Sequence, residues 1–215
     1  MYLKELKNEL QNVLSGKSVS SYDAVIQAVA GQLRTSQRAS PMAEAKHQNK
    51  NEETKKLIEF ASNHNLFIDT IDESKFISQG AEQKVYIQDS QYVIKLNDAI
   101  YYASWEDYFY NLLLHNYFFA DTHYQLLGFY QNQDTLFAVV RQSFIKADSI
   151  TDLSDIKGFL SSNGFENIKN HDYYHPALGI ILEDLHDENV LTQNSILFFI
   201  DTVFYINPDV FWDNN

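Results

Sequence analysis

A polar loop between two short apolar runs near the C-terminus constrains the fold of this chain more than any other stretch. The runs, at 178–182 and 196–200, have the length and composition of buried strands. Asp184 and Asn189 lie in the loop, and Asp201 follows the second run. An acid, an amide five residues later and a second acid leaving a buried strand form a spacing that can hold a divalent metal and nucleotide phosphates.

The loop has two interpretations. In the first, Asp184 accepts a hydroxyl proton, while Asn189 and Asp201 ligate Mg²⁺, a hard cation that prefers oxygen ligands in octahedral geometry. In the second, Asp184, His186 and Asn189 belong to a solvated acidic turn, because Asp, His and Asn often hydrogen-bond nearby backbone in ordinary turns. The sequence upstream of the loop favours the first interpretation.

Composition limits the classes of protein that remain. With 215 residues, 45% of them hydrophobic, the chain can bury one sizeable core, or a core and a small appendage. It has no cysteine, which excludes a disulfide framework and a Cys-based metal site. The N-terminus is amphipathic and charged, and no apolar run is long enough to span a bilayer. We therefore expect a soluble cytoplasmic protein without a membrane partner.

The net charge of −13 is distributed unevenly. Residues 1–60 carry 9 Lys/Arg and 7 Asp/Glu, whereas residues 61–215 carry 7 Lys/Arg and 22 Asp/Glu. An acidic body repels a phosphate backbone, so nucleic acid is not an expected partner. An ATP site in the acidic part requires Mg²⁺ and local positive groups to offset the field.

The first part of the chain predicts helices. Apolar stripes at 2–14 and 22–37 have helical spacing, residues 38–51 are polar and without period, and a third helix is expected at 52–63. We interpret 38–51 as a linker or mobile loop. Such stripes are typical of packing within the chain, and a docking surface for another protein is the alternative. Residues 1–60 are therefore expected to dock a protein partner or to complete a lobe.

From residue 66 the pattern changes to that of strands. A turn containing Gly80 separates the first two, and an aromatic helix follows the third. Two strands joined across a glycine, a third strand and two more after the helix predict a five-stranded antiparallel sheet with an inserted helix. The expected strands lie at 76–78, 84–88, 92–96, 124–130 and 136–142, and the helix lies at 104–119.

Two residues of this sheet are candidates for ligand contacts. Gly80 allows backbone to approach a ligand closely because it has no Cβ, although a plain tight turn also explains one glycine. Lys95 lies within an apolar strand, where a lysine either extends to the surface or faces a cleft and meets an anion. Its place in the third strand, after the glycine turn, favours the cleft.

The aromatic helix also contains candidates. Glu106 lies in its first turn, where the helix N-terminus stabilises a carboxylate, and it could pair with Lys95. Asp107 is the competing acid. His115 is expected to face the core or the surface rather than bind a metal, because no histidine lies four residues further on. The histidines of the chain form no such pair on a helix face, which disfavours a metal hydrolase.

Together these elements resemble the protein-kinase-like superfamily. The closest resemblance is to the protein kinase domain of bacterial polyvalent proteins, which are multidomain proteins of phages and conjugative elements. The matching segments lie between about residues 65 and 206 and read GAEQKVY (80–86), VIK (93–95), EDLHDENVL (183–191) and FFIDTVF (198–204).

The resemblance implies an α+β fold and a division of the chain into three parts. Residues 61–142 would form the kinase-like N-lobe and residues 143–215 a minimal helical C-lobe, both preceded by the helices of 1–60. The implied function is ATP- and Mg²⁺-dependent phosphotransfer to a hydroxyl of a protein or a small molecule. The alternative is a non-catalytic, kinase-like interaction domain of a polyvalent protein.

The resemblance also implies catalytic roles. Lys95 would contact the α- and β-phosphates of ATP and pair with Glu106. Asp184 would orient or deprotonate the acceptor hydroxyl. Asn189 and Asp201 would hold Mg²⁺. Lysine and Mg²⁺ would neutralise charge on the transferring phosphoryl group, which is the main source of catalysis in this class.

The remaining implied contacts are with the cofactor. Backbone at Gly80 and Ala81 would cover the ATP phosphates. Residues 141–144, which include Gln142 and Phe144, would form the hinge that meets adenine.

The chain departs from the usual kinase pattern at several points. The phosphate-covering turn has one glycine, and Thr202 and Val203 follow Asp201. The D-L-H form of the catalytic loop resembles aminoglycoside and choline kinases. Only fourteen residues follow Asp201, so we expect a minimal lower lobe, or one completed by the N-terminal helices or by another chain. Peptide phosphorylation is the less expected form of the activity.

Overall fold

The computed structural model describes residues 2–18, 22–37, 46–80 and 83–213. The chain begins with three helices, α1 (Tyr2–Leu14), α2 (Ala24–Gln37) and α3 (Lys46–Asn63). The linker predicted at 38–51 was wrong over 46–51, which are helical, while 38–45 lie outside the described residues. Residues 46–51 are rich in Lys, Gln and Asn without proline or glycine, so nothing in their composition stops the helix.

A five-stranded antiparallel sheet follows, in the order β1-β2-β3-β5-β4. The predicted five strands with a helix inserted after the third are confirmed. Ser104 caps this helix, since its side chain accepts a hydrogen bond from the backbone N–H of Asp107. The elements are β1 (Phe76–Gln79), β2 (Gln83–Ile87), β3 (Tyr92–Asn97), α4 (Trp105–Phe118), β4 (Gln125–Asn132) and β5 (Thr135–Ser143), with short 3-10 turns η1 (Glu73–Lys75) and η2 (Ala120–Thr122).

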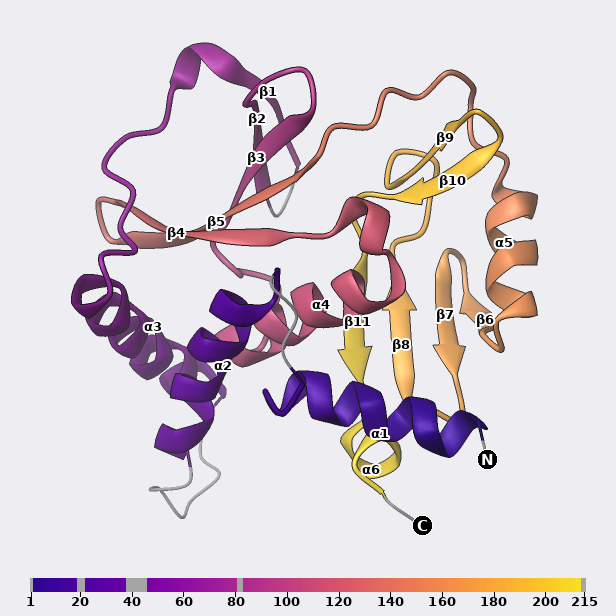
Figure 1. Cartoon of the computed structure of the whole chain (residues 1–215), viewed down its shortest axis with the longest axis horizontal. Coiled ribbons are helices and arrows are strands. Elements are labelled where there is room, and N and C mark those ends of the chain that lie inside the picture. Colours follow the sequence, from indigo (N-terminus) through magenta and orange to yellow (C-terminus); the bar gives the residue numbers. More distant parts are fainter. Residues whose placement is uncertain (1, 19–21, 38–45, 81–82, 214–215) are drawn as a thin grey trace.

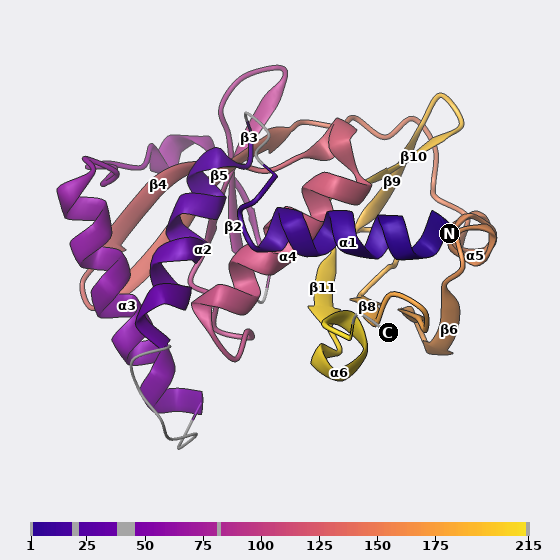
Figure 2. The ribbon, with the colours of Figure 1, turned by 60° about the horizontal axis from the view of Figure 1, so that its bottom comes forward.

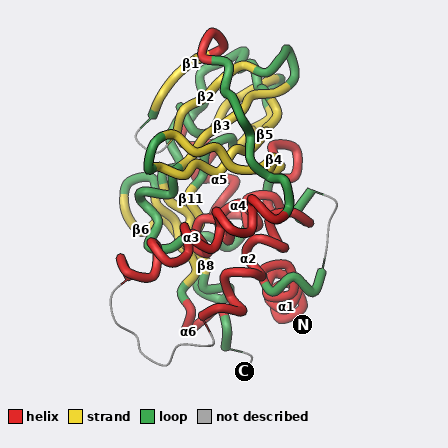
Figure 3. The backbone as a smooth tube through the Cα atoms, turned by 90° about the vertical axis from the view of Figure 1, so that its left-hand side faces the viewer, coloured by secondary structure: helices red, strands yellow, loops and turns green. Residues whose placement is uncertain are grey.

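Helix α4 lies at the centre of the molecule (Figure 1). Phe109 on α4 meets Phe129 on β4 edge to face, with ring centroids 6.4 Å apart. Helices α1, α2 and α3 also contact α4, and Figure 2 shows α1 and α2 lying along it. One continuous apolar core therefore includes Leu10 of α1, Leu33 of α2 and Phe109. Figure 3 shows the five-stranded sheet at one end of the molecule, with these helices beneath it.

The C-terminal part is built mainly from strands. A second antiparallel sheet has the order β11-β8-β7-β6, and β9 and β10 form a separate hairpin. The predicted minimal helical C-lobe was wrong in this respect, because the described residues of 143–213 contain only two α-helices. The elements are α5 (Leu153–Ser162), β6 (Glu166–Lys169), β7 (Asp172–His175), β8 (Ile180–Glu183), β9 (Val190–Gln193), β10 (Ile196–Phe199), β11 (Val203–Ile206) and α6 (Pro208–Phe211).

Hydrogen bonds join the N-terminal helices to both parts of the chain. Gln11 Nε2 on α1 donates to the main-chain oxygen of Phe211 on α6, at 2.6 Å. Asn116 Nδ2 on α4 donates to Asp23 Oδ1 and to the main-chain oxygen of Tyr124, both at 2.8 Å. The first helices are thus bonded to α4 and to the last helix. Within the described ranges, no helix is long and apolar enough to cross a membrane.

Candidate active site

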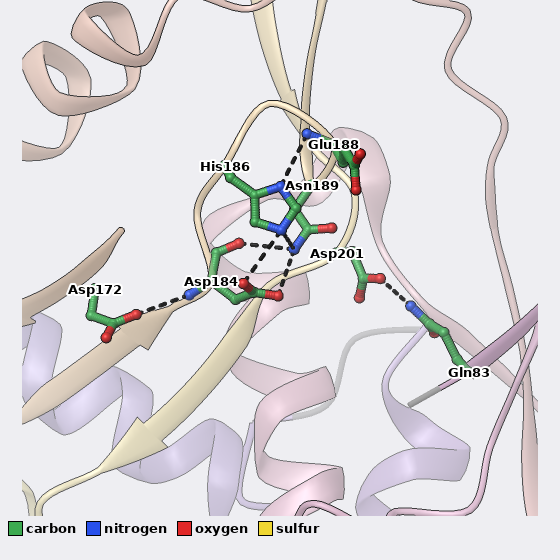
Figure 4. Close-up of polar contacts among 7 residues, drawn as sticks. All are labelled: Gln83, Asp172, Asp184, His186, Glu188, Asn189 and Asp201. Carbon is green, nitrogen blue, oxygen red and sulfur yellow. Dashed lines mark hydrogen bonds and ion pairs between the residues drawn. The ribbon is translucent and has the colours of Figure 1, made fainter. Parts of the chain in front are cut away.

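The loop between β8 and β9 closes around Asp184. Asn189 Nδ2 donates to both the main-chain oxygen and Oδ2 of Asp184, each at 2.8 Å (Figure 4). His186 Nδ1 accepts from the backbone N–H of Glu188, so its proton lies on Nε2, 3.3 Å from Asp184 Oδ1. Asp184 has φ of 64°, an uncommon conformation for a residue with a side chain. The structure thus brings together the three polar residues that the sequence placed in this loop.

The β6–β7 hairpin supports the loop from outside. Asp172 Oδ1 accepts from the backbone N–H of Asp184 at 3.2 Å, and His171 accepts through its main-chain oxygen from the N–H of Leu185 at 3.1 Å. Burial raises the pKa of Glu183, and the neighbouring charges of Asp172 and Asp184 raise it further. This hairpin was not predicted from the sequence, although Asn170, with φ of 46°, lies in its turn and asparagine is a typical turn residue.

Asp201 is held by backbone contacts to Asn189. The N–H groups of Ile200 and Asp201 both donate to the main-chain oxygen of Asn189, at 2.9 and 3.3 Å. Gln83 Nε2, at the start of β2, donates to Asp201 Oδ2 (Figure 4). The two residues predicted to bind Mg²⁺ are therefore adjacent, and a side chain from the five-stranded sheet reaches them. The sequence analysis did not identify Gln83, because nothing in a polar strand residue indicates a partner 118 positions away.

Gly80 directly follows β1, and Gln83 begins β2. The N–H of Gly80 donates to the main-chain oxygen of Gln83 at 3.0 Å. A Cβ placed on Gly80 would meet no atom within 4 Å, so internal packing among the described residues does not require glycine there. Ala81, the second residue predicted to cover the phosphates, lies outside the described residues.

Lys95 is buried beside Asp201, with 4% of its surface exposed. Its Nζ donates to the main-chain oxygen of Ile200 at 2.8 Å, and Tyr124 donates its hydroxyl to the same oxygen at 2.9 Å. Burial lowers the pKa of Lys95, while the carboxylate of Asp201 acts in the opposite direction. Among the described residues, no carboxylate forms an ion pair with Lys95. The lysine that the sequence assigned to a cleft lies in the interior and contacts the residue before Asp201.

Glu106 is placed elsewhere, so the predicted Lys95–Glu106 pair does not form. Glu106 Oε1 accepts from the hydroxyl of Tyr110 at 2.8 Å, and burial followed by the charge of Glu106 raises the pKa of that tyrosine. The physical reason is helical phase. His115 lies nine residues after Glu106, which is two and a half turns, and therefore on the opposite side of α4. The face of α4 turned towards Lys95 presents His115.

His115 is fully buried, so of the two placements expected for it, the core and the surface, the structure has the core. Its Nδ1 lies 2.7 Å from Thr202 Oγ1, and its Nε2 lies 2.9 Å from the main-chain oxygen of Thr122. Burial, reinforced by the charge of Lys95, lowers the pKa of His115 to about 3. A neutral imidazole therefore occupies this position at neutral pH.

The predicted hinge is partly strand. β5 extends to Ser143, so only Phe144 of the interval 141–144 belongs to the connector that crosses to α5 (Figure 1). The N–H of Phe144 donates to the main-chain oxygen of Gln91 at 2.7 Å. Gln142 is 1% exposed and donates through Nε2 to the main-chain oxygen of Thr122 at 2.7 Å. Its side chain therefore lies in the interior, near His115.

The site offers oxygen ligands suited to Mg²⁺. The main-chain oxygen of Asp184 can only accept, so Nδ2 of Asn189 faces it and Oδ1 is left for a cation. Gln83 contacts Oδ2 of Asp201, which leaves Oδ1 of that carboxylate. Within the described residues, no group of three or more His, Cys, Asp or Glu side chains could hold a metal. One carboxylate and one amide fit a Mg²⁺ whose other ligands are phosphates and water.

Residues 50–208 match a protein family described as Serine/Threonine/Tyrosine Kinase found in polyvalent proteins. The chain belongs to this family. The match runs from within α3 to the start of α6 and contains every site residue described above, whereas residues 1–49 lie outside it. No curated protein and no solved structure matches the chain. The resemblance to the kinase domain of polyvalent proteins is thus confirmed.

Proposed function

We propose that this kinase-like domain transfers a phosphoryl group from Mg²⁺-bound ATP to a hydroxyl of a protein or a small molecule. The convergence of Lys95, Asn189 and Asp201 carries the proposal. Lys95 Nζ bonds to Ile200, the residue before Asp201, and the main-chain oxygen of Asn189 accepts from Asp201 itself. A cation for phosphate and two oxygen ligands for metal thus meet at one strand end.

Each residue then has a chemical role. Lys95 binds the phosphates, and its burial strengthens that attraction because the local dielectric is low. Asn189 and Asp201 would hold Mg²⁺, and the bound ion would neutralise negative charge on the transferring phosphoryl group. Asp184 orients or deprotonates the acceptor hydroxyl, and its carboxylate is held in place by Asn189 and His186. The backbone near Gly80 covers the phosphates.

The N-terminal helices are proposed to complete the domain. The contact of Asp23 with Asn116 supports this role, because it joins a residue outside the family match to one inside it, and α1 also contacts α4, which lies within the match. The alternative role, docking of a partner protein, would need a face of these helices that is not already packed. Buried Leu10 and Leu33 show that their main apolar faces are used within the chain.

A non-catalytic nucleotide-binding domain is the second candidate. Two contacts favour it, because Gln83 engages the carboxylate of Asp201 and Lys95 is bonded to Ile200. A phosphate and a metal ion would have to compete with both. A domain that uses these contacts to stay closed would bind ATP weakly and transfer nothing.

Calorimetry of ATP binding with and without Mg²⁺ tests the proposal. The wild type should bind ATP, and Mg²⁺ should increase the affinity. Asp201→Asn should lose that increase, while Asp187→Asn, an exposed acid in the catalytic loop, should keep it. Release of inorganic phosphate from MgATP, suppressed by Asp184→Asn, then separates a transferase from the non-catalytic domain. A wild type that binds no ATP at millimolar concentration with Mg²⁺ contradicts both candidates.

A further inference from the structure

A buried polar network connects α4 to the residue after Asp201. His115, Thr122, Gln142 and Thr202 are each no more than 1% exposed. His115 contacts Thr202 through Nδ1 and Thr122 through Nε2, and Gln142 Nε2 donates to the same main-chain oxygen of Thr122. The Thr122 hydroxyl also donates to the main-chain oxygen of Phe199, at 2.5 Å. The network therefore joins α4, η2 and β5 to the strand end that carries Asp201.

The positions of the protons in this network follow from the acceptors. The main-chain oxygen of Thr122 has no proton to donate, so His115 must donate to it through a protonated Nε2. The neutral ring then has a bare Nδ1, which can only accept. The hydroxyl of Thr202 therefore donates to Nδ1, at 2.7 Å. This arrangement of hydrogens pairs both ring nitrogens and uses the hydroxyl at position 202.

We propose that His115 is a positioning residue that fixes Asp201 for Mg²⁺ through its hydrogen bond to the hydroxyl of Thr202. The inference rests on the proposed function and adds to it a partner of the metal ligand on α4. The other restraints on this strand end come from different directions. Asn189 accepts from the N–H of Asp201, and Lys95 and Tyr124 bond to the oxygen of Ile200. On the C-terminal side, the bond to His115 holds the residue directly after Asp201, and the pairing of β11 with β8 begins one residue later, at Val203.

Packing alone does not explain these residue types. A histidine and a threonine buried in an apolar core cost free energy unless every polar atom is paired. The ring of His115 already packs against Tyr124 and Phe119, with centroids 4.5 and 5.4 Å away, and an apolar side chain could fill that space. The network instead keeps a directional bond next to a metal ligand. Hydrogen bonds made to a metal ligand itself typically alter metal affinity by about 10–100-fold, and for a bond one residue away from the ligand we expect the lower end of this range.

The ratio of ATP affinities with and without Mg²⁺ provides the test. Thr202→Val keeps the shape but removes the hydroxyl, and we expect this ratio to fall by about 10-fold or more. Thr202→Ser keeps the hydroxyl and should keep the wild-type ratio. A Thr202→Val protein that folds and retains the ratio overturns the inference while leaving the proposed function intact. A wild type without any Mg²⁺-dependent ATP binding overturns both.

A second pair of variants separates the two ring nitrogens. Asn places its amide where Nδ1 lies, so His115→Asn can still accept from Thr202. Gln places its amide where Nε2 lies, so His115→Gln keeps only the bond to Thr122. Both variants should lose stability, but only His115→Gln should lose the Mg²⁺-dependent ratio. If the ratio of ATP affinities with and without Mg²⁺ is the same in the two variants, the bond to Thr202 has no role in positioning Asp201. This comparison remains informative even if Thr202→Val does not fold.

Hydrogen exchange adds a readout without nucleotide. The N–H of Asp201 is bonded to Asn189, so its exchange reports how firmly this strand end is held. Exchange at Asp201 should be faster in His115→Gln than in His115→Asn, relative to a core amide such as that of Phe109. If His115→Gln exchanges no faster than His115→Asn at Asp201, the bond does not hold the ligand and the inference fails.

Discussion

Truncation of Leu33 should unfold the kinase-like part together with the N-terminal helices. Leu33 lies on α2, outside the family match, and is fully buried in the core that includes Phe109 of α4. Leu→Ala at such a site costs about 2–5 kcal/mol, because the lost apolar contact and the residual cavity both count. For a domain of this size, that corresponds to a melting temperature lower by about 4–20 °C.

Urea unfolding followed by two probes measures this effect. The chain has two tryptophans, Trp105 on α4, which is 1% exposed, and Trp212, which is 40% exposed. In a Trp212→Phe background, fluorescence reports α4 and far-UV circular dichroism reports all helices. Both probes should shift to lower urea by the same amount in Leu33→Ala. Leu3→Ala, on the exposed side of α1, is the matched control and should change stability by less than about 0.5 kcal/mol.

Two results would refute the reasoning. In the first, Leu33→Ala loses helical signal at low urea while the Trp105 transition stays where it is in the wild type. The N-terminal helices would then form a separate folding unit, and docking of a partner protein would be the better explanation of their role. In the second, Leu33→Ala and Leu3→Ala have equal unfolding free energies, which would mean that the core described around α4 is not formed by α2.

Three further predictions concern buried charges and a buried imidazole. Lys95→Met should raise the free energy of unfolding and abolish ATP binding, because burial of the ammonium, which lowers the pKa of Lys95, disfavours its charged form in the ligand-free fold. Urea unfolding and calorimetry measure both effects, and a less stable variant contradicts the first. The pKa of His115, about 3 in the folded state, lies below its unfolded value, so the unfolded chain binds the proton first as pH falls. The contribution of this group to the free energy of unfolding is complete above about pH 6.5 and is lost towards pH 3, at up to about 1.4 kcal/mol per pH unit. The free energy of unfolding should therefore fall less steeply with falling pH in His115→Gln than in the wild type. Equal pH dependence in the two proteins would exclude the imidazole as the cause. Glu53 is buried and accepts from the backbone N–H of Trp105, in the first turn of α4, at 2.7 Å. Glu53→Gln should cost about 1–2 kcal/mol in thermal unfolding through loss of a charge at the helix N-terminus, whereas the exposed Glu52→Gln should be neutral, and equal effects would contradict the assignment.

Strong local patterns made the five-stranded sheet and the loop between β8 and β9 predictable. Alternation and turn residues placed the strands, and the spacing of Asp184, Asn189 and Asp201 gave a site that the structure assembles. The phase of α4 was not predictable in the same way. Apolar and aromatic residues surround that helix on every side, so the sequence gives no amphipathic stripe to show whether Glu106 or His115 faces Lys95.

The elements that sequence reasoning missed lack local signals. All four residues of β6 are exposed and polar residues dominate it, so it shows neither alternation nor an apolar run. Its pairing with β7 depends on the turn at Asn170 and on contacts to the catalytic loop. Gln83 was missed because its partner is defined only by the folded geometry. Helix ends and strand pairs can be inferred from neighbours in sequence, whereas contacts between distant polar residues cannot.

The bond between Gln11 and Phe211 has a consequence for how this protein is made. The two residues are separated by 200 positions, so α1 emerges from the ribosome long before α6 exists. At about 5–20 residues per second, the delay is about 10–40 s. During that interval Gln11 lacks the acceptor that it has in the folded protein. The contact between α1 and α6 therefore forms only after the roughly 200 residues between them have been synthesised.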